Sequence, residues 1–214
     1  MKALRRTLAM AGTAALVAIA GPAWAGGPYT VAAGGTTAGT ANFIGVTTGY
    51  VPPVHLDVVT MSVSCDSSTM TGDINLGIST GGMDIADINT TTWNNCQGPV
   101  SLQITHVGTW SFNATGTPGA VIEGTVTGAH LRAVALNPST GLPDPTLCSF
   151  DVTGTVDVSF DQTLQQMAVP SSSGSTMLTA SNVVGCFGLL ADGDPAGIEA
   201  TYAIASSPGA ITIS

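Results

Sequence analysis

Apolar and polar residues alternate along much of this chain, and this period of two constrains its fold more than any other feature. Successive side chains of a β-strand point to opposite faces, so the period indicates strands with one buried face. We find no convincing helical period beyond residue 25, and Gly- and Pro-rich turn signals separate the alternating runs. The pattern predicts an all-β fold, a β-sandwich or barrel of about ten to twelve short strands. The clearest runs are Val59–Cys65, Ile74–Ile78, Val100–Ile104, Trp110–Phe112, Cys148–Phe160, Ile198–Ile204 and Ile211–Ile213.

The first 25 residues have the features of an export signal. Lys2, Arg5 and Arg6 precede an apolar run over residues 8–20, and Ala23-Trp24-Ala25 is the small-x-small pattern that a signal peptidase accepts. The alternative is a membrane anchor, but a bilayer needs about 20 apolar residues. We therefore expect a signal peptide over residues 1–25 and a secreted protein, extracellular or at the cell surface. The Arg pair leaves the twin-arginine route open beside the general secretory route.

The remaining chain divides by composition. Residues 26–40 are rich in Gly, Ala and Thr, and we expect them to form a flexible leader, with a first edge strand as the alternative. Residues 41–214 are expected to form the β domain, in which two related halves are suggested, about 41–120 and 121–214. Cys65 and Cys148 each precede a Thr-Gly strand, and Cys96 and Cys186 each open a Cys-x-Gly turn. Chance similarity between strands rich in Thr, Gly and Val is the alternative.

Four cysteines, Cys65, Cys96, Cys148 and Cys186, lie beyond the signal. An even number in an exported protein favours disulfides, and the absence of a Cys-x-x-Cys spacing disfavours zinc. Four cysteines permit three pairings. If the two halves are related, equivalent cysteines form equivalent bonds, which predicts Cys65–Cys96 and Cys148–Cys186.

Charge limits the partners. Arg132 is the one strong cation beyond residue 25 and faces thirteen carboxylates, which gives a formal side-chain charge of −12. Nucleic-acid binding needs clustered Lys or Arg, so this composition excludes it, and it also disfavours anionic membrane surfaces. A neutral cell-surface component, a cationic partner, a partner bridged by a divalent metal, or self-association remains compatible with this charge.

Calcium is the ion for which the sequence offers candidate ligands, and no other cofactor is indicated. Calcium binds six to eight oxygen ligands, which closely spaced acidic loops supply. The alternative is turn chemistry, because Asp and Asn also cap their own backbone. The weak candidates are Asp84, Asp87, Asn89, Asp192 and Asp194.

Catalytic motifs are absent from the sequence. His55, His106 and His130 lie in separate segments without ligand spacing, and no G-x-S-x-G elbow is present. Glu123 and Glu199 are the only glutamates, and the acids within strands are expected on solvated faces. Trp93 is the one candidate platform for a glycan, although it could instead pack on a disulfide.

The segments Trp93–Pro99, Cys148–Gly154 and Gly185–Gly188, followed by Gly193-Asp194 and Ala200–Tyr202, carry a resemblance. Their order resembles a group of uncharacterised secreted β-rich proteins of high-GC Gram-positive bacteria, from about residue 42 to the end. The resemblance implies export and a β-rich fold, and it implies no activity, ligand or site residue.

These features favour a secreted, non-enzymatic structural or interaction protein of the cell envelope or extracellular space. The first alternative is an extracellular domain that binds a small apolar molecule or a glycan in the interior of the sandwich or barrel. An extracellular hydrolase is the second. An interior cavity would favour binding, and a Ser–His or carboxylate pair in a cleft would favour hydrolysis.

We predict that the exported protein begins at Gly26, because the small-x-small pattern ends at Ala25. N-terminal sequencing of protein from the culture medium or cell surface tests this. A mature chain that retains Lys2 would show that the segment is an anchor.

Overall fold

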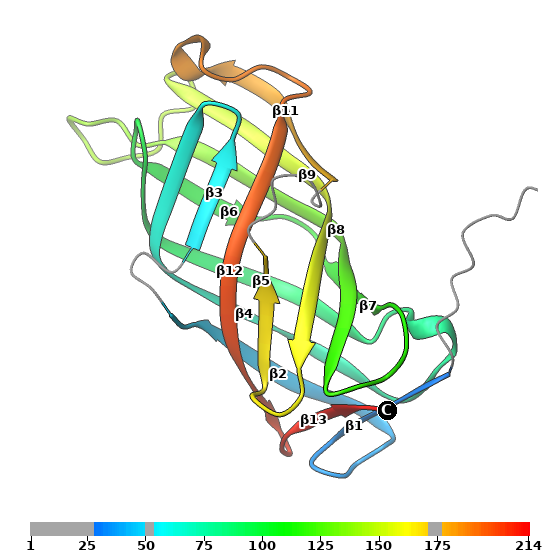
Figure 1. Cartoon of the computed structure of the whole chain (residues 1–214). Coiled ribbons are helices and arrows are strands. Elements are labelled where there is room, and N and C mark those ends of the chain that lie inside the picture. Colours follow the sequence, from blue (N-terminus) through cyan, green and yellow to red (C-terminus); the bar gives the residue numbers. More distant parts are fainter. Residues whose placement is uncertain (1–27, 50–53, 171–176) are drawn as a thin grey trace, which may run out of the picture.

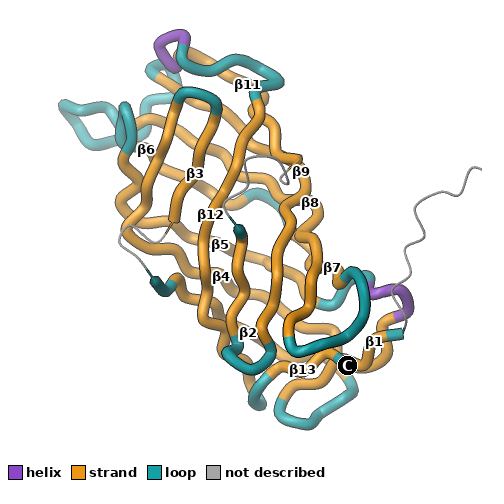
Figure 2. Tube along the Cα trace, in the orientation of Figure 1, coloured by secondary structure: helices purple, strands orange, loops and turns teal. Residues whose placement is uncertain are grey.

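The alternating segments form antiparallel strands in the structure, a computed structural model that describes residues 28–49, 54–170 and 177–214. Strands account for most of these residues, with two short 3₁₀ turns, η1 (Thr80–Gly82) and η2 (Cys186–Gly188) (Figure 2). Within these ranges no helix is long and apolar enough to span a membrane. The strands are β1 (Tyr29–Ala33), β2 (Gly39–Thr47), β3 (Val54–Val58), β4 (Met61–Ser79), β5 (Ala86–Gln97), β6 (Leu102–His106), β7 (Trp110–Ala114), β8 (Val121–Ala135), β9 (Cys148–Asp161), β10 (Gln166–Val169), β11 (Met177–Gly185), β12 (Pro195–Ser207) and β13 (Ile211–Ile213).

Eleven of these strands, β2 to β12, follow one another in chain order around a ring (Figure 1). We call each place around the ring a position. Five positions are each occupied by one long strand: β4, β5, β8, β9 and β12. Three further positions are each shared by two short strands placed end to end: β2 with β3, β6 with β7, and β10 with β11. β12 pairs back with both β2 and β3, so the up-and-down meander closes on itself. Of the two predicted architectures, this ring is the barrel.

The strands are longer and more numerous than predicted. Thirteen lie in the described residues, and five of them contain 12 to 19 residues. β-Bulges explain part of the difference, because an extra residue shifts the alternation without ending the strand. One bulge follows Thr71, where Asn89 is the extra residue on β5, and another separates Val126 from Ala129 on β8.

The predicted flexible leader over residues 26–40 is wrong for its described part. β1 pairs with β13 and with β4, and the side chains of Tyr29 and Val31 are fully buried. Both partner strands are remote in the sequence. A five-residue run of mostly small residues therefore gave little sign of its pairing.

The two suggested halves each supply four consecutive positions of the ring. Cys65–Cys96 links the second position to the third, and Cys148–Cys186 links the sixth to the turn that ends the seventh. Both predicted disulfides are thus confirmed, and two structural disulfides fit an oxidising compartment. This arrangement is the one that a duplication would give, and the duplication itself stays a prediction.

Apolar side chains fill the interior of the ring. Phe150, Leu56 and Ile122 are among the largest side chains that are fully buried there. Two cavities lined by core residues measure about 30 and 40 Å³. Ligand cavities usually measure about 300–1,000 Å³. The two interior cavities therefore do not offer room for the small apolar molecule or glycan considered from the sequence.

One end of the ring is covered by β1 and β13, and we call it the β13 end (Figure 1). Side-chain amides replace a neighbouring strand there. Gln165 donates from Nε2 to the Ile211 carbonyl (2.9 Å) and accepts the Ile211 N–H (2.7 Å). Gln162 makes the same pair of bonds with Ile213, at 3.0 and 2.5 Å. These bonds satisfy backbone groups of β13 that pairing with β1 leaves over.

The other end, which we call the disulfide end, gathers the connections at residues 59–60, 98–101, 136–147 and 186–194. Both disulfides lie close to these connections. Cys65 and Cys96 are register partners on β4 and β5, and Cys148 pairs through its backbone with Gly185 of β11. The bases of three of the four connections are therefore tied to the wall of the ring.

We predict that Gln165→Ala lowers the free energy of unfolding by about 1–3 kcal/mol, because it leaves the Ile211 backbone groups without partners. Gln103→Ala on the exposed face of β6 is the matched control, with an expected change within about 0.5 kcal/mol. Urea unfolding measures both. Equal effects of the two variants would show that the amide ladder does not hold β13.

Candidate functional site

A groove of about 550 Å³ lies at the disulfide end, between three connections of the ring. The β5–β6 connection forms one wall, the β8–β9 connection forms another, and η2 contributes Phe187. Its size falls within the range of small-molecule sites. The lining residues are Gln97, Gly98, Pro99, Val100, Ser101, Leu136, Asn137, Pro138, Gly141, Leu147 and Phe187.

Hydrogen bonds fix the polar side chains of the β5–β6 wall. Ser101 donates from Oγ to Gln97 Oε1 at 2.8 Å, and Gln97 donates from Nε2 to Asn95 Oδ1 at 2.9 Å. Asn95 in turn donates to the Asp66 carboxylate on β4 at 2.6 Å. Gly98 lies against the backbone of Ser62, where a Cβ atom would be crowded. The chain turns tightly here and presents Gln97 and Ser101 to the groove.

The β8–β9 wall is organised by Asp144. Its carboxylate accepts the Thr146 hydroxyl (2.6 Å) and the Thr146 backbone N–H (3.1 Å). It also accepts a longer bond from Asn137 Nδ2 (3.4 Å), and Asn137 Oδ1 accepts the Ser139 N–H. The hydrogen bonds from Thr146, followed by that from Asn137, lower the pKa of the exposed Asp144 carboxyl. Asn137 is therefore held in place at the edge of the groove.

Phe187 projects into solvent from a strained turn. Gly185, Cys186, Phe187 and Gly188 all have positive φ angles, which cost energy for the two residues that are not glycine. A Cβ atom on Gly185 would overlap the Leu147 carbonyl, and the Cys148–Cys186 bond anchors the turn. Phe187 is left 66% exposed, although it is a large apolar side chain.

The groove carries no charge of its own, because none of its lining residues is ionisable. The acids bonded next to it are Asp144, which holds Asn137, and Asp66, which holds Asn95. An anion would approach against their field, and a cation would find no carboxylate in the lining. The electrostatics thus disfavour an anion, and the lining itself offers a cation no carboxylate ligand.

The first calcium candidates do not lie in a loop as the sequence suggested. Asp87 and Asn89 are on β5, whereas Asp84 precedes the strand. Asp87 accepts the Ser111 hydroxyl at 2.9 Å, and Asn89 donates to Asp73 at 2.7 Å. Asp84 contributes backbone groups to bonds with Asn75 and Asn113.

Asp192 and Asp194 lie in the turn between η2 and β12, and both cap backbone groups. Asp192 accepts the Val183 N–H and Asp194 accepts the Ala191 N–H, at 2.9 and 2.8 Å. Across the described ranges, no three acidic, histidine or cysteine side chains are grouped to hold a metal ion. These bonds match the turn chemistry that was the alternative to calcium.

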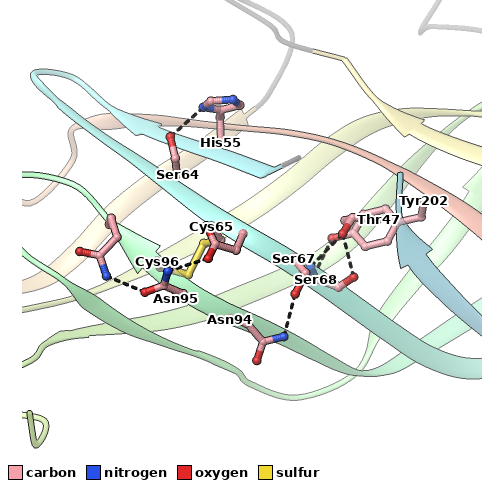
Figure 3. The surroundings of a disulfide bond; sticks show 12 residues. Thr47, His55, Ser64, Cys65, Ser67, Ser68, Asn94, Asn95, Cys96 and Tyr202 are labelled. Carbon is pink, nitrogen blue, oxygen red and sulfur yellow. Dashed lines mark hydrogen bonds between the residues drawn. A yellow bond between two sulfur atoms is a disulfide. The ribbon is translucent and has the colours of Figure 1, made fainter. Parts of the chain in front are cut away.

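The one Ser–His pair in the described part of the chain lies on the outer wall (Figure 3). Ser64 Oγ is 3.1 Å from His55 Nδ1, and Glu199 is the register partner of His55 on β12. Serine, histidine and acid therefore form a row across three strands. None of the three lines the groove. Glu123 lies away from this row, on β8 opposite Ser159.

His106 and the two tryptophans form an aromatic stack. His106 lies over Trp110 with ring centroids 4.3 Å apart, and Trp93 lies 6.3 Å from Trp110. His106 Nε2 bonds to the Gly108 carbonyl, so this nitrogen carries the proton and Nδ1 accepts from Thr91. Trp93 is packed against the core instead of standing free as a platform for a glycan.

His130 and Arg132 lie beside the carboxylate of a buried acid, Asp151. Asp151 has little exposure and lies between β8 and β11, with Arg132 Nη1 at 3.5 Å and His130 Nε2 at 3.4 Å. Asn182 donates a shorter bond to it, at 2.8 Å. The one strong cation beyond residue 25 thus compensates a buried charge in the wall.

Sequence reasoning missed the groove and its aromatic residue. Phe187 is the middle residue of the second Cys-x-Gly turn. The sequence comparison used that turn only to relate the two halves, and it assigned the aromatic residue no role. A signal was present, since a large aromatic between Cys186 and Gly188 lies outside any alternating strand. Such a residue has no core position to occupy. That residues 97–101 lie close to residues 136–147 could be predicted only from the order of the strands around the ring.

No protein-family model, curated protein or solved structure matches this chain. The resemblance to secreted proteins of high-GC Gram-positive bacteria therefore stays an expectation. The function proposed below follows from the geometry of the chain itself.

We predict that protonation of His106 destabilises the fold. Burial lowers the pKa of His106 below its ordinary value of 6.5, which outweighs the opposing effect of the bond to Gly108; the charge of His130 also lowers it. The folded state therefore prefers the neutral ring, and stability is lost as the pH falls below about 6.5. His106→Phe keeps a ring beside Trp110 and should lose this part of the decline.

Urea unfolding at pH 7.5 and pH 5.5, followed by tryptophan fluorescence, measures the effect. His55→Phe on the outer wall is the matched control for the loss of a histidine. An unchanged pH dependence in His106→Phe would contradict the assignment.

Proposed function

We propose that this protein is exported and acts, without catalysis, as an interaction protein that binds a neutral component of the cell envelope. The groove at the disulfide end is the binding surface, and Phe187 is its central contact. The exposed aromatic ring in a groove free of charged residues is the observation that carries the proposal.

The construction of the disulfide end supports this assignment. Binding sites on β-proteins commonly lie in loops that a rigid scaffold positions. Here the disulfide bonds and the bonds of Gln97 and Asn137 hold the lining residues in place. A prearranged site loses less conformational entropy when it binds. The strained turn keeps the Phe187 ring exposed and thus available for such a contact.

Charge and cysteine usage support the location. With −12 on the side chains beyond residue 25, the protein is repelled by nucleic acids and anionic surfaces and suits a neutral partner. The two disulfides fit an oxidising compartment, and the signal over residues 1–25, which lies outside the described residues, supplies the route.

The outer-wall row of Ser64, His55 and Glu199 is the specific feature that would favour a hydrolase instead. A serine nucleophile needs its base in place, a third group to orient that base, and donors for the oxyanion. The Ser64 hydroxyl lies within hydrogen-bond distance of His55 Nδ1. In the described residues, no hydrogen bond joins Glu199 to His55 to orient the ring. In the described residues the row therefore lacks the contact between base and orienting acid that hydrolysis by a serine nucleophile requires.

A co-sedimentation assay tests the proposal. The exported protein is mixed with insoluble envelope material from the cells that produce it, and the bound fraction is measured across protein concentrations. We predict binding that Phe187→Ala weakens about tenfold, the size of effect expected for a central aromatic contact.

Leu164→Ala is the matched control, because Leu164 is similarly exposed (62%) and lies in the β9–β10 turn at the opposite end of the ring. It should leave binding unchanged. Binding that is absent, or that Phe187→Ala does not weaken, would overturn the proposed function.

A further inference from the structure

We infer that the ligand of the groove is a neutral saccharide, an inference that rests on the proposed function and names the class of its partner. Three properties of the lining carry it: its side chains both donate and accept hydrogen bonds, an aromatic face stands beside them, and no lining residue is charged.

The hydrogen-bonding groups match hydroxyls. A side-chain amide has two N–H donors and two acceptor lone pairs. Gln97 uses one N–H on Asn95 and one lone pair on Ser101, and Asn137 uses one of each on Asp144 and Ser139. Each amide keeps a donor and an acceptor, and Ser101 Oγ keeps acceptor capacity. Sugar hydroxyls, which also donate and accept, can satisfy both kinds of group.

The apolar part of the lining matches the other side of a sugar. One face of many pyranose rings presents C–H groups, which pack on an aromatic face and remove its apolar surface from water. Phe187 offers such a face, with Pro99 and Pro138 also in the lining. The groove thus combines an apolar surface with amides and a hydroxyl, as a ligand with one apolar face and a polar edge requires.

Other ligand classes fit the same residues less well. A wholly apolar ligand would cover the amides of Gln97 and Asn137 without replacing their hydrogen bonds to water, which costs free energy. An anion would lose its hydration and face Asp144 and Asp66, and a cation would lose its hydration without meeting a carboxylate in the lining itself. A neutral saccharide avoids both costs.

Selective destruction of the envelope material tests the inference. Sodium periodate cleaves the vicinal diols of sugars, whereas proteinase K removes protein. We expect periodate to reduce binding of the exported protein by about tenfold or more, and proteinase K to leave it unchanged. Neutral oligosaccharides released from the untreated material by mild acid should compete for binding.

Variants locate the contact in the groove. Phe187→Tyr keeps the aromatic face and should bind the oligosaccharides within about threefold of the parent, whereas Phe187→Ala should bind about tenfold more weakly. Gln97→Ala should also weaken binding, while Gln103→Ala on the exposed face of β6 should not. Circular dichroism and intact-mass analysis show whether each variant is folded with both disulfides.

The outcomes separate this inference from the proposed function. If binding depends on Phe187 but is removed by proteinase K and not by periodate, the protein is an interaction protein and the saccharide assignment is wrong. If the oligosaccharides do not compete, the assignment is also wrong. If untreated material shows no binding that depends on Phe187, the proposed function itself fails.

Discussion

Closure of the ring by β12 is the interaction on which the rest of the structure depends. β12 pairs along its length with β2 and β3, which joins the last position of the meander to the first. An open sheet would leave two edges with unpaired backbone groups, and closure removes them. It also forces the connections to the two ends, because adjacent antiparallel strands must turn there. The placement of the groove is a consequence of the closure.

The two ends are finished by different chemistry, and the groove lies at the disulfide end. At the β13 end, β1, β13 and the amides of Gln162 and Gln165 satisfy backbone groups and cover the core. At the disulfide end, covalent bonds hold the bases of the connections. Those connections can then adopt strained or polar conformations without loosening the wall. The turn anchored by Cys148–Cys186 can therefore hold Phe187 exposed.

Features that depend on local sequence could be predicted, whereas contacts between segments remote in the sequence could not. Alternation from Cys148 to Phe160 gave the inward face of β9, and equivalent cysteines gave both disulfides. β1 was foreseen only as the alternative to a flexible leader because its partners are remote, and β5 was partly mistaken for a loop because a bulge at Asn89 hides its phase. The groove could not be derived, since it depends on connections that only the ring order brings together.

The way this protein neutralises its acids bears on what it can recognise. Arg132 is committed to Asp151, so the other carboxylates are met mostly by hydroxyls, amides and backbone N–H groups, as Asp66 is by Asn95 and Asp87 by Ser111. Such bonds satisfy a carboxylate without cancelling its charge. The field of the protein therefore stays negative, while its donors are neutral. A ligand that is itself neutral and rich in hydroxyls would use those donors without opposing that field, and this is the partner class that we propose for the groove.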